Sequence, residues 1–218
     1  MRISGGKWGG RTIKTPPGDK IRPTQDCVRE ALFSMLSDRI ADAVWADVFA
    51  GSGSVGLEAL SRGTQKAIWV EKNPLNARLI ADNAQTLAGE KAAELPAPGR
   101  GIPHRKMRRP NGRIEPFPIP ISSPGSEICV CDAVAWLSGG GRTRNVDVLF
   151  ADPPYQAARD NGFSEMLKLA AENETVAVGG LFIGEMPADK VPEDIDGWES
   201  IRDRLYGKTR LHIWRRTK

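Results

Sequence analysis

The residues with the clearest chemical potential are four in a row, Asp152, Pro153, Pro154 and Tyr155, directly after the apolar segment 146–151. Such a short apolar run predicts a buried strand, and two prolines end it because they donate no backbone hydrogen bond. The chain then presents a carboxylate, a proline carbonyl and an aromatic ring. Together these groups could accept the hydrogens of a planar exocyclic amine and stack on its base. A plain strand-to-helix loop with a proline stop explains the four residues equally well when they are taken alone.

A second group of candidate residues lies in the glycine-rich segment 47–56. Gly51, Gly53 and Gly56 fit the GxGxxG spacing of dinucleotide-binding loops, a weak signal by itself. Glycines let the backbone turn sharply and approach a ligand, and a following helix offers free N–H groups to it. Glu71 ends the next predicted strand, where a carboxylate can bind both ribose hydroxyls. These features predict an adenosine-containing cofactor, and a nicotinamide dinucleotide fits them too.

The acidic residues separate the cofactor alternatives. Asp47 lies four residues before Gly51, which is a poor position for a pyrophosphate and a good one for the ammonium group of a methionine-like tail. Asp132 and Asp152 end two further predicted strands, in reach of an adenine amine or a substrate amine. A cleft lined by acids suits the cationic cofactor S-adenosylmethionine better than a doubly anionic dinucleotide.

The elements that must position these residues alternate between strand and helix. Strands are predicted over 44–49, 66–71, 128–131, 146–151 and 180–186, and helices over 53–62, 74–87, 133–137 and 161–172. This alternation predicts an α/β fold with a parallel, doubly wound sheet and ligands at the carboxyl ends of its strands. An antiparallel hairpin is predicted to end the chain, over 201–206 and 209–215.

The order of these predicted elements also indicates the domain organisation. We expect an extension over residues 1–40, made of a small β-hairpin and a helix that Thr24 caps. The helix face with Arg29 and Glu30 is expected to meet solvent or substrate. Residues 41–218 form the cofactor-binding domain, interrupted by the Pro- and Gly-rich insertion 89–127. The insertion reads as a flexible surface loop or a small β-excursion, and we expect a monomer.

Charge is clustered along the chain. The net charge is only +4 over 218 residues, but basic residues gather in 1–22, 99–114 and 202–218. Any single cluster is typical of a solvated surface, whereas three clusters around one base pocket favour a nucleic acid partner. Trp8 could stack on a nucleotide, although we favour a role in fastening the hairpin to the body.

Several function classes are disfavoured. No run of about 18 apolar residues exists that would predict a membrane span, and the N-terminus has no apolar core of a secretory signal. The three cysteines include no CxxC pair, and the two histidines are far apart and expected at the surface. We therefore expect a cytoplasmic protein without a metal site, a disulfide framework or a catalytic histidine.

The combined motifs resemble the bacterial 16S rRNA guanine-N2 methyltransferases of the small-subunit type. The resemblance rests on residues 2–11, 22–33, 47–63, 152–155 and 204–207 and spans nearly the whole chain except 89–127. It implies a Rossmann-like methyltransferase fold, with a mostly parallel seven-stranded sheet, a reversed last strand and helices on both faces. It also implies transfer of a methyl group from S-adenosylmethionine to N2 of one guanine in 16S rRNA, free or in the assembling 30S subunit.

The resemblance also implies roles for single residues. The cofactor-binding residues are Asp47, Phe49, Gly51 and Gly53 at the methionine end, Glu71 at the ribose and Asp132 at the adenine. The catalytic residues are Asp152, Pro153 and Tyr155, which hold the target amine and base. The candidate substrate-binding residues are Arg2, Lys7, Trp8, Arg11, Arg22, Thr24 and Pro154.

Three other functions remain open on sequence grounds. The Asp-Pro-Pro-Tyr chemistry also serves DNA adenine methyltransferases and other nucleic-acid amino methyltransferases. A nicotinamide oxidoreductase would use the glycine loop, and an RNA-binding protein without activity would use the basic clusters.

Overall fold

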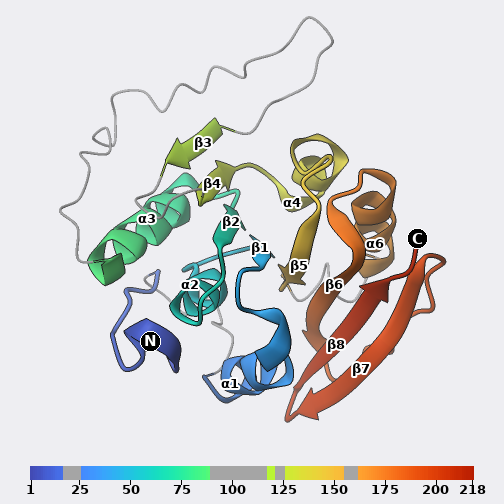
Figure 1. Ribbon diagram of the computed structural model, residues 1–218, viewed down its shortest axis with the longest axis horizontal. Coiled ribbons are helices and arrows are strands. Elements are labelled where there is room, and N and C mark those ends of the chain that lie inside the picture. Colours follow the sequence, from blue (N-terminus) through green and yellow to red (C-terminus); the bar gives the residue numbers. More distant parts are fainter. Residues whose placement is uncertain (17–25, 89–116, 121–125, 155–161) are drawn as a thin grey trace, which may run out of the picture.

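The computed structural model describes residues 1–16, 26–88, 117–120, 126–154 and 162–218. Within these residues a single eight-stranded sheet has the order β3-β4-β2-β1-β5-β6-β8-β7 and carries helices on both faces (Figure 1). The strands are β1 (Val44–Val48), β2 (Lys66–Val70), β3 (Phe117–Pro120), β4 (Glu127–Val130), β5 (Val146–Ala151), β6 (Val176–Pro187), β7 (Trp198–Tyr206) and β8 (Thr209–Arg216). The helices are α1 (Asp26–Met35), α2 (Ser54–Ser61), α3 (Pro74–Ala88), α4 (Ala133–Ala135) and α6 (Gly162–Glu172), with the short turns η1 (Gly6–Trp8), η2 (Ser37–Arg39) and η3 (Trp136–Gly140).

The strand directions confirm the predicted fold. Strands β4, β2, β1, β5 and β6 run parallel to one another, and β8 runs antiparallel to both β6 and β7. These seven strands make the predicted mostly parallel sheet with a reversed last strand. The carboxyl ends of the five parallel strands meet at one edge, where the candidate residues of the sequence lie.

The eighth strand, β3, comes from the insertion. It pairs antiparallel with β4 and forms an outer edge of the sheet. Proline has no backbone N–H to donate to a further strand, so Pro118 and Pro120 are compatible with a position at the edge of the sheet. The small β-excursion is therefore present at 117–120, and the rest of 89–127 lies outside the described residues except Ser126 and Glu127.

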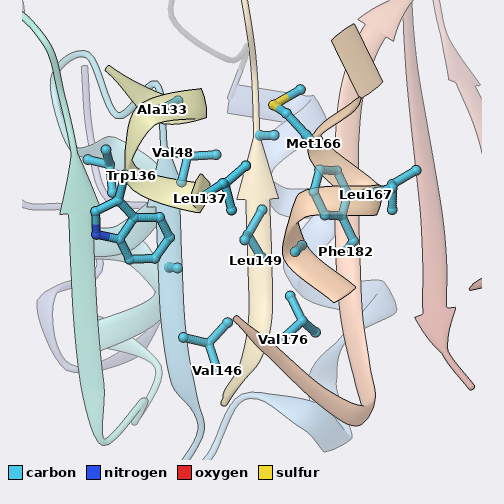
Figure 2. Close-up of a cluster of buried hydrophobic side chains, with 14 of the residues drawn as sticks. Val48, Ala133, Trp136, Leu137, Val146, Leu149, Met166, Leu167, Val176 and Phe182 are labelled. Atoms are coloured by element: carbon cyan, nitrogen blue, oxygen red, sulfur yellow. The ribbon is translucent and has the colours of Figure 1, made fainter. Parts of the chain in front are cut away.

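Side-chain alternation in the strands separates two apolar layers. In β1, Ala46 and Val48 pack with α4, η3 and α6 on one face, and Trp45 packs with α1 on the other. Figure 2 shows the first layer, in which Leu149 of β5 lies among side chains from η3, α6 and β6. Helices α2 and α3 cover the second face beside α1. Burial on both faces explains why these strands are almost entirely apolar.

The N-terminal residues form a looser hairpin than the sequence suggests. One isolated bridge joins Arg2 and Thr12, and the turn between them contains η1. Ile3 and Ile13 are buried in the layer of α2 and α3. Trp8 is half-buried against the same layer, and its backbone N–H donates to Ser61 Oγ at 2.9 Å. These contacts support the fastening role of Trp8.

Two surface expectations are wrong. Arg29 of α1 is fully buried and pairs with the equally buried Glu58 of α2 at 3.3 Å, while its neighbour Glu30 is exposed. His212 of β8 is 4 % exposed because its ring lies against Trp214. Arg29 donates to Glu58, Asp26 and the Arg2 carbonyl, and His212 Nε2 lies 2.9 Å from Ser200 Oγ. Hydrophobic patterning gives no signal for such polar contacts inside the fold.

Candidate active site

A cleft of about 440 Å³ opens at the carboxyl edge of the sheet. This volume lies within the range of small-molecule sites. Its walls are formed by the segments that follow β1, β2, β4 and β5, by the carboxyl end of β6 and by the turn between β7 and β8. The residues lining it are Phe49, Gly51, Val70, Glu71, Lys72, Asn73, Asn76, Cys131, Asp132, Ala133, Asp152, Pro153, Pro154, Glu185, Met186, Pro187, Lys208 and Thr209.

The loop after β1 has an unusual backbone. Phe49, Gly51 and Gly53 all have positive φ angles, of 69°, 55° and 76°. For Phe49 this conformation is uncommon and costs energy, so the surrounding contacts must enforce it. The N–H groups of Phe49 and Ala50 both donate to the Val70 carbonyl. The loop is thus pinned to the end of β2, and the Phe49 ring is held at the wall of the cleft.

Glu71 fastens the same loop from the other side. Its two carboxylate oxygens accept from the Gly51 N–H at 2.8 Å and the Asn73 N–H at 2.7 Å. The side chain is 7 % exposed, yet it lines the cleft. A carboxylate oxygen has more than one lone pair, so both can accept further bonds from ribose hydroxyls.

Asp47 lies beneath the loop and does not line the cleft. It is 2 % exposed, and its Oδ2 accepts from the Gly56 N–H of α2 at 3.1 Å. Burial raises the pKa of Asp47 to about 7, and the nearby Glu71 carboxylate adds to the rise while the Gly56 bond opposes it. Asp47 therefore anchors the start of α2, and its predicted contact with an ammonium group stays a prediction.

The second and third glycines of the motif allow close packing. A Cβ at Gly53 would come within 2.9 Å of the Ile80 side chain, and one at Gly56 within 2.3 Å of Trp69 Nε1. Gly53 precedes α2, and its carbonyl accepts from Trp69 Nε1 at 3.3 Å. These glycines serve the fit of α2 against β2 and α3, while Gly51 lines the cleft itself.

Asp132 combines two roles. Its Oδ1 accepts from the N–H groups of Val134 and Ala135, at 2.9 and 3.2 Å, which makes Asp132 the N-cap of α4. The side chain is exposed and lines the cleft. Each carboxylate oxygen has more than one lone pair, so a ligand amine at this wall can share the group.

The Asp-Pro-Pro run follows β5 as predicted. Asp152 is half-buried, Pro153 is buried and Pro154 is exposed, and all three line the cleft. Tyr155, the predicted stacking residue, lies outside the described residues. Arg22 and Thr24, two candidate substrate contacts, lie outside them as well.

The remaining substrate candidates sit on the N-terminal hairpin, which is not part of the cleft wall. The exposed Lys7 ammonium lies 4.5 Å from the centroid of the Trp8 ring. The guanidinium of Arg11 donates to the carbonyls of Thr86 and Leu87 at the end of α3. Arg2 has an exposed side chain, and its carbonyl accepts from Arg29. Arg11 thus caps α3, and contacts of these residues with RNA stay predictions.

Sequence reasoning missed several residues of the cleft. Asn73 and Asn76 follow Glu71, Cys131 precedes Asp132, and Glu185 lies two residues before the end of β6. The rule that ligands bind at the carboxyl ends of strands could have indicated Glu185. Lys208 and its neighbour Thr209 had no such signal, because they reach the cleft through the antiparallel pairing of β8 with β6.

A second hollow of about 920 Å³ adjoins the cleft, with Phe49 and Pro153 at its border. Five carboxylates line it against the single ammonium of Lys168, and they belong to Glu165, Glu172, Glu193, Asp194 and Asp196. Such a surface repels a phosphate backbone, and it lacks Glu71, Asp132 and Asp152, so the smaller cleft that these residues line is the better candidate site.

The strand order divides the cleft into two halves. Glu71 and Asp132 follow β2 and β4 on one side of β1, whereas Asp152 follows β5 and Glu185 lies near the carboxyl end of β6 on the other. The loop after β1 lies between them. One half offers carboxylates to hydroxyls and amines of a cofactor, and the other offers them to a second amine.

Among the described helices, none combines the length and apolar character needed to cross a membrane.

Comparisons with known proteins agree with this arrangement. The chain is 29 % identical over 217 residues to the ribosomal RNA small subunit methyltransferase D of Escherichia coli K12, covering 99 % of this chain and 90 % of that protein. The solved structure of the Escherichia coli protein yhhF is 27 % identical, with a TM-score of 0.74 over 100 % of this chain and 98 % of that one.

More distant structures show the same fold. An RNA methyltransferase of Salinibacter ruber, solved with S-adenosyl-L-homocysteine, is 10 % identical with a TM-score of 0.56 over 90 % of this chain and 95 % of that one. The sheet order, the reversed β8 and these likenesses identify a methyltransferase fold. A family model described as conserved hypothetical protein 95 matches residues 1–98 and 125–215, and the chain belongs to that family.

Proposed function

We propose that this protein is an S-adenosylmethionine-dependent methyltransferase that acts on the exocyclic N2 amine of a guanine in 16S rRNA. The observation that carries the proposal is the cleft, which combines Glu71, Asp132 and the strained loop after β1 with the Asp152-Pro153-Pro154 corner. The full-length likeness to a ribosomal RNA small subunit methyltransferase supports the rRNA substrate. Action on rRNA or the assembling 30S subunit would also agree with a cytoplasmic location.

The residues fit the cofactor. S-adenosylmethionine, when bound, supplies an electrophilic methyl group on a positively charged sulfur. Glu71 would accept from the ribose hydroxyls and Asp132 from the adenine amine, while Gly51 lets the backbone approach the methionine end. The carboxylates around the cleft favour a cationic ligand, since opposite charges attract more strongly where water is scarce.

The other half of the cleft would hold the base. Asp152 and the Pro153 carbonyl accept the two N2 hydrogens and thereby turn the nitrogen lone pair toward the methyl group. The N2–C bond forms as the S–C bond breaks, sulfur keeps the bonding pair, and the extra N2 proton is released toward Asp152. Tyr155 is the candidate for stacking on the flipped base, a contact worth about 1–3 kcal/mol that offsets unstacking.

The rate enhancement on this view comes from positioning and electrostatics, without a covalent intermediate on the protein. Burial raises the pKa of Cys131, which lines the cleft, to about 12. Its thiol stays protonated at neutral pH and is a poor nucleophile. The chemistry therefore depends on the carboxylates and carbonyls.

The decisive experiment offers labelled S-adenosylmethionine with unmethylated 30S subunits, naked 16S rRNA and DNA, followed by nucleoside analysis. N2-methylguanosine in rRNA is the expected product. N6-methyladenosine, or label in DNA alone, would instead establish a different amino methyltransferase. Asp152→Ala should abolish transfer while S-adenosylhomocysteine binding, measured by calorimetry, is retained; unchanged turnover would refute its role.

A further inference from the structure

Glu185 lies beside Asp152 at the carboxyl edge of the sheet. In the parallel pair of β5 and β6, Ala151 is in register with Gly184, so the next residue on each strand is one of the two acids. Neighbouring strands are about 4.8 Å apart. Both side chains line the same cleft, and Glu185 is half-buried.

The surroundings keep Glu185 on the substrate side. Residues 185–187 pair with Leu211, Arg210 and Thr209 of β8. This pairing holds the end of β6 in place, on the opposite side of β1 from the strands that precede Glu71 and Asp132. Met186, Pro187 and Thr209 form the cleft wall around it, with Lys208 at the turn. Glu185 is therefore separated from the cofactor half by the whole width of β1 and β5.

Two adjacent carboxylates match one base better than the others. Guanine carries N1–H and N2–H₂ side by side, so its edge presents neighbouring donors. Adenine has the acceptor N1 next to its amine, and cytosine has the acceptor N3. A carboxylate accepts hydrogen bonds and does not donate them. A second carboxylate next to Asp152 would therefore accept a hydrogen bond from guanine N1–H, whereas it would repel the ring-nitrogen lone pair of adenine or cytosine.

We infer that Glu185 is a specificity-determining residue that accepts the N1–H of the target guanine while Asp152 holds its N2 amine. This inference rests on the proposed function and adds the reason for guanine over adenine. The site disfavours the wrong base because the Glu185 carboxylate would then face a second acceptor instead of the N1–H donor, and the hydrogen bond to the base is lost.

The test compares guanine with 2-aminopurine at the methylated position of 16S rRNA in rebuilt 30S particles. 2-Aminopurine keeps the N2 amine but has an acceptor at N1. Wild-type protein should favour guanine in kcat/KM. Glu185→Gln, whose amide can donate to N1, should lower the guanine to 2-aminopurine ratio by roughly 10- to 100-fold, the range expected for one hydrogen bond to a charged group. A purely structural role would lower both rates and leave the ratio unchanged.

Two further variants complete the design. Glu199→Gln makes the same change on the exposed face of β7, where Glu199 pairs with Arg215, and should keep the wild-type ratio. Glu185→Asp keeps the carboxylate and should keep the preference at a lower rate, which provides a readout if the glutamine variant folds poorly. S-adenosylhomocysteine affinity by calorimetry should be the same for all variants.

The outcomes distinguish the inference from the proposed function. N2-methylguanosine production with equal base ratios in wild type and Glu185→Gln would overturn the inference and leave the proposed function intact. Absence of N2-methylguanosine from the wild-type reaction would overturn both. Loss of S-adenosylhomocysteine binding in Glu185→Gln would place the residue in the cofactor half and also overturn the inference.

Discussion

Glu58 of α2 is buried where this helix meets α1 and the N-terminal hairpin. Among the described charged residues outside the cleft, its replacement should lower the free energy of unfolding most. The Glu58 carboxylate is fully buried and accepts from the Ser4 N–H and hydroxyl, both at 2.7 Å, from Arg29 Nε at 3.3 Å and from Arg62 Nε at 3.0 Å. Replacing it with alanine removes a common partner of all three residues. The guanidinium of Arg29, equally buried, would lose this contact with the Glu58 carboxylate.

The expected cost of Glu58→Ala follows from this burial. Removing one partner of a buried ion pair costs about 3–5 kcal/mol because the other charge is left uncompensated. Asp26 still pairs with Arg29 at 3.0 Å, but its side chain is 64 % exposed and replaces little of the lost interaction. A domain with about 5–15 kcal/mol of stability loses a large share of it through this one change.

Urea unfolding, followed by circular dichroism and tryptophan fluorescence, measures the free energy of unfolding. The matched control is Glu199→Ala, which removes an exposed ion pair with Arg215 and should cost less than about 1 kcal/mol. The double variant Arg29→Met with Glu58→Leu removes both charges and should recover most of the loss. The reasoning fails if Glu58→Ala costs no more than the control, or if the double variant costs as much as both single variants together.

Three further predictions concern residues that surround the loop after β1: Asp47 in β1, Gly56 in α2 and Glu71 after β2. Asp47→Asn should change the pH dependence of the free energy of unfolding. Because the pKa of Asp47 is raised in the folded protein, its favourable contribution is complete below pH 3.8 and is lost as pH rises through about 7. Denaturation at several pH values should therefore show wild type losing about 1.4 kcal/mol per pH unit across that window relative to the variant. Equal slopes for both proteins would contradict this. Gly56→Ala should destabilise by about 1–3 kcal/mol, because the new Cβ would meet the fully buried Trp69 indole at 2.3 Å; a thermal melt like that of wild type would show that the helix can shift. Glu71→Gln should weaken S-adenosylhomocysteine binding by roughly tenfold or more in calorimetry, since the amide can accept from only one of the Gly51 and Asn73 N–H groups, and unchanged affinity would argue against its ribose role.

Much of the fold was predictable because its signals are local. The strand over 146–151 is found with the same bounds, since an apolar run with a proline stop has few other solutions. The helix beginning at Pro74 follows from proline at the first turn and apolar spacing. Ends defined by pairing were less accurate: β6 begins at Val176, four residues before its predicted start, because its first residue pairs with Val146.

The sequence by itself determined which chemical groups stand at strand ends, because a glycine turn, a proline stop and a short apolar run act on their own neighbours in the chain. Only the tertiary structure decided which of these groups meet. Glu185 comes beside Asp152 through the register of β5 and β6, Lys208 reaches the cleft through the reversal of β8, and Arg29 is drawn inside by a carboxylate 29 residues away. Such placements depend on pairing and packing between distant segments, for which no single stretch of sequence carries the signal.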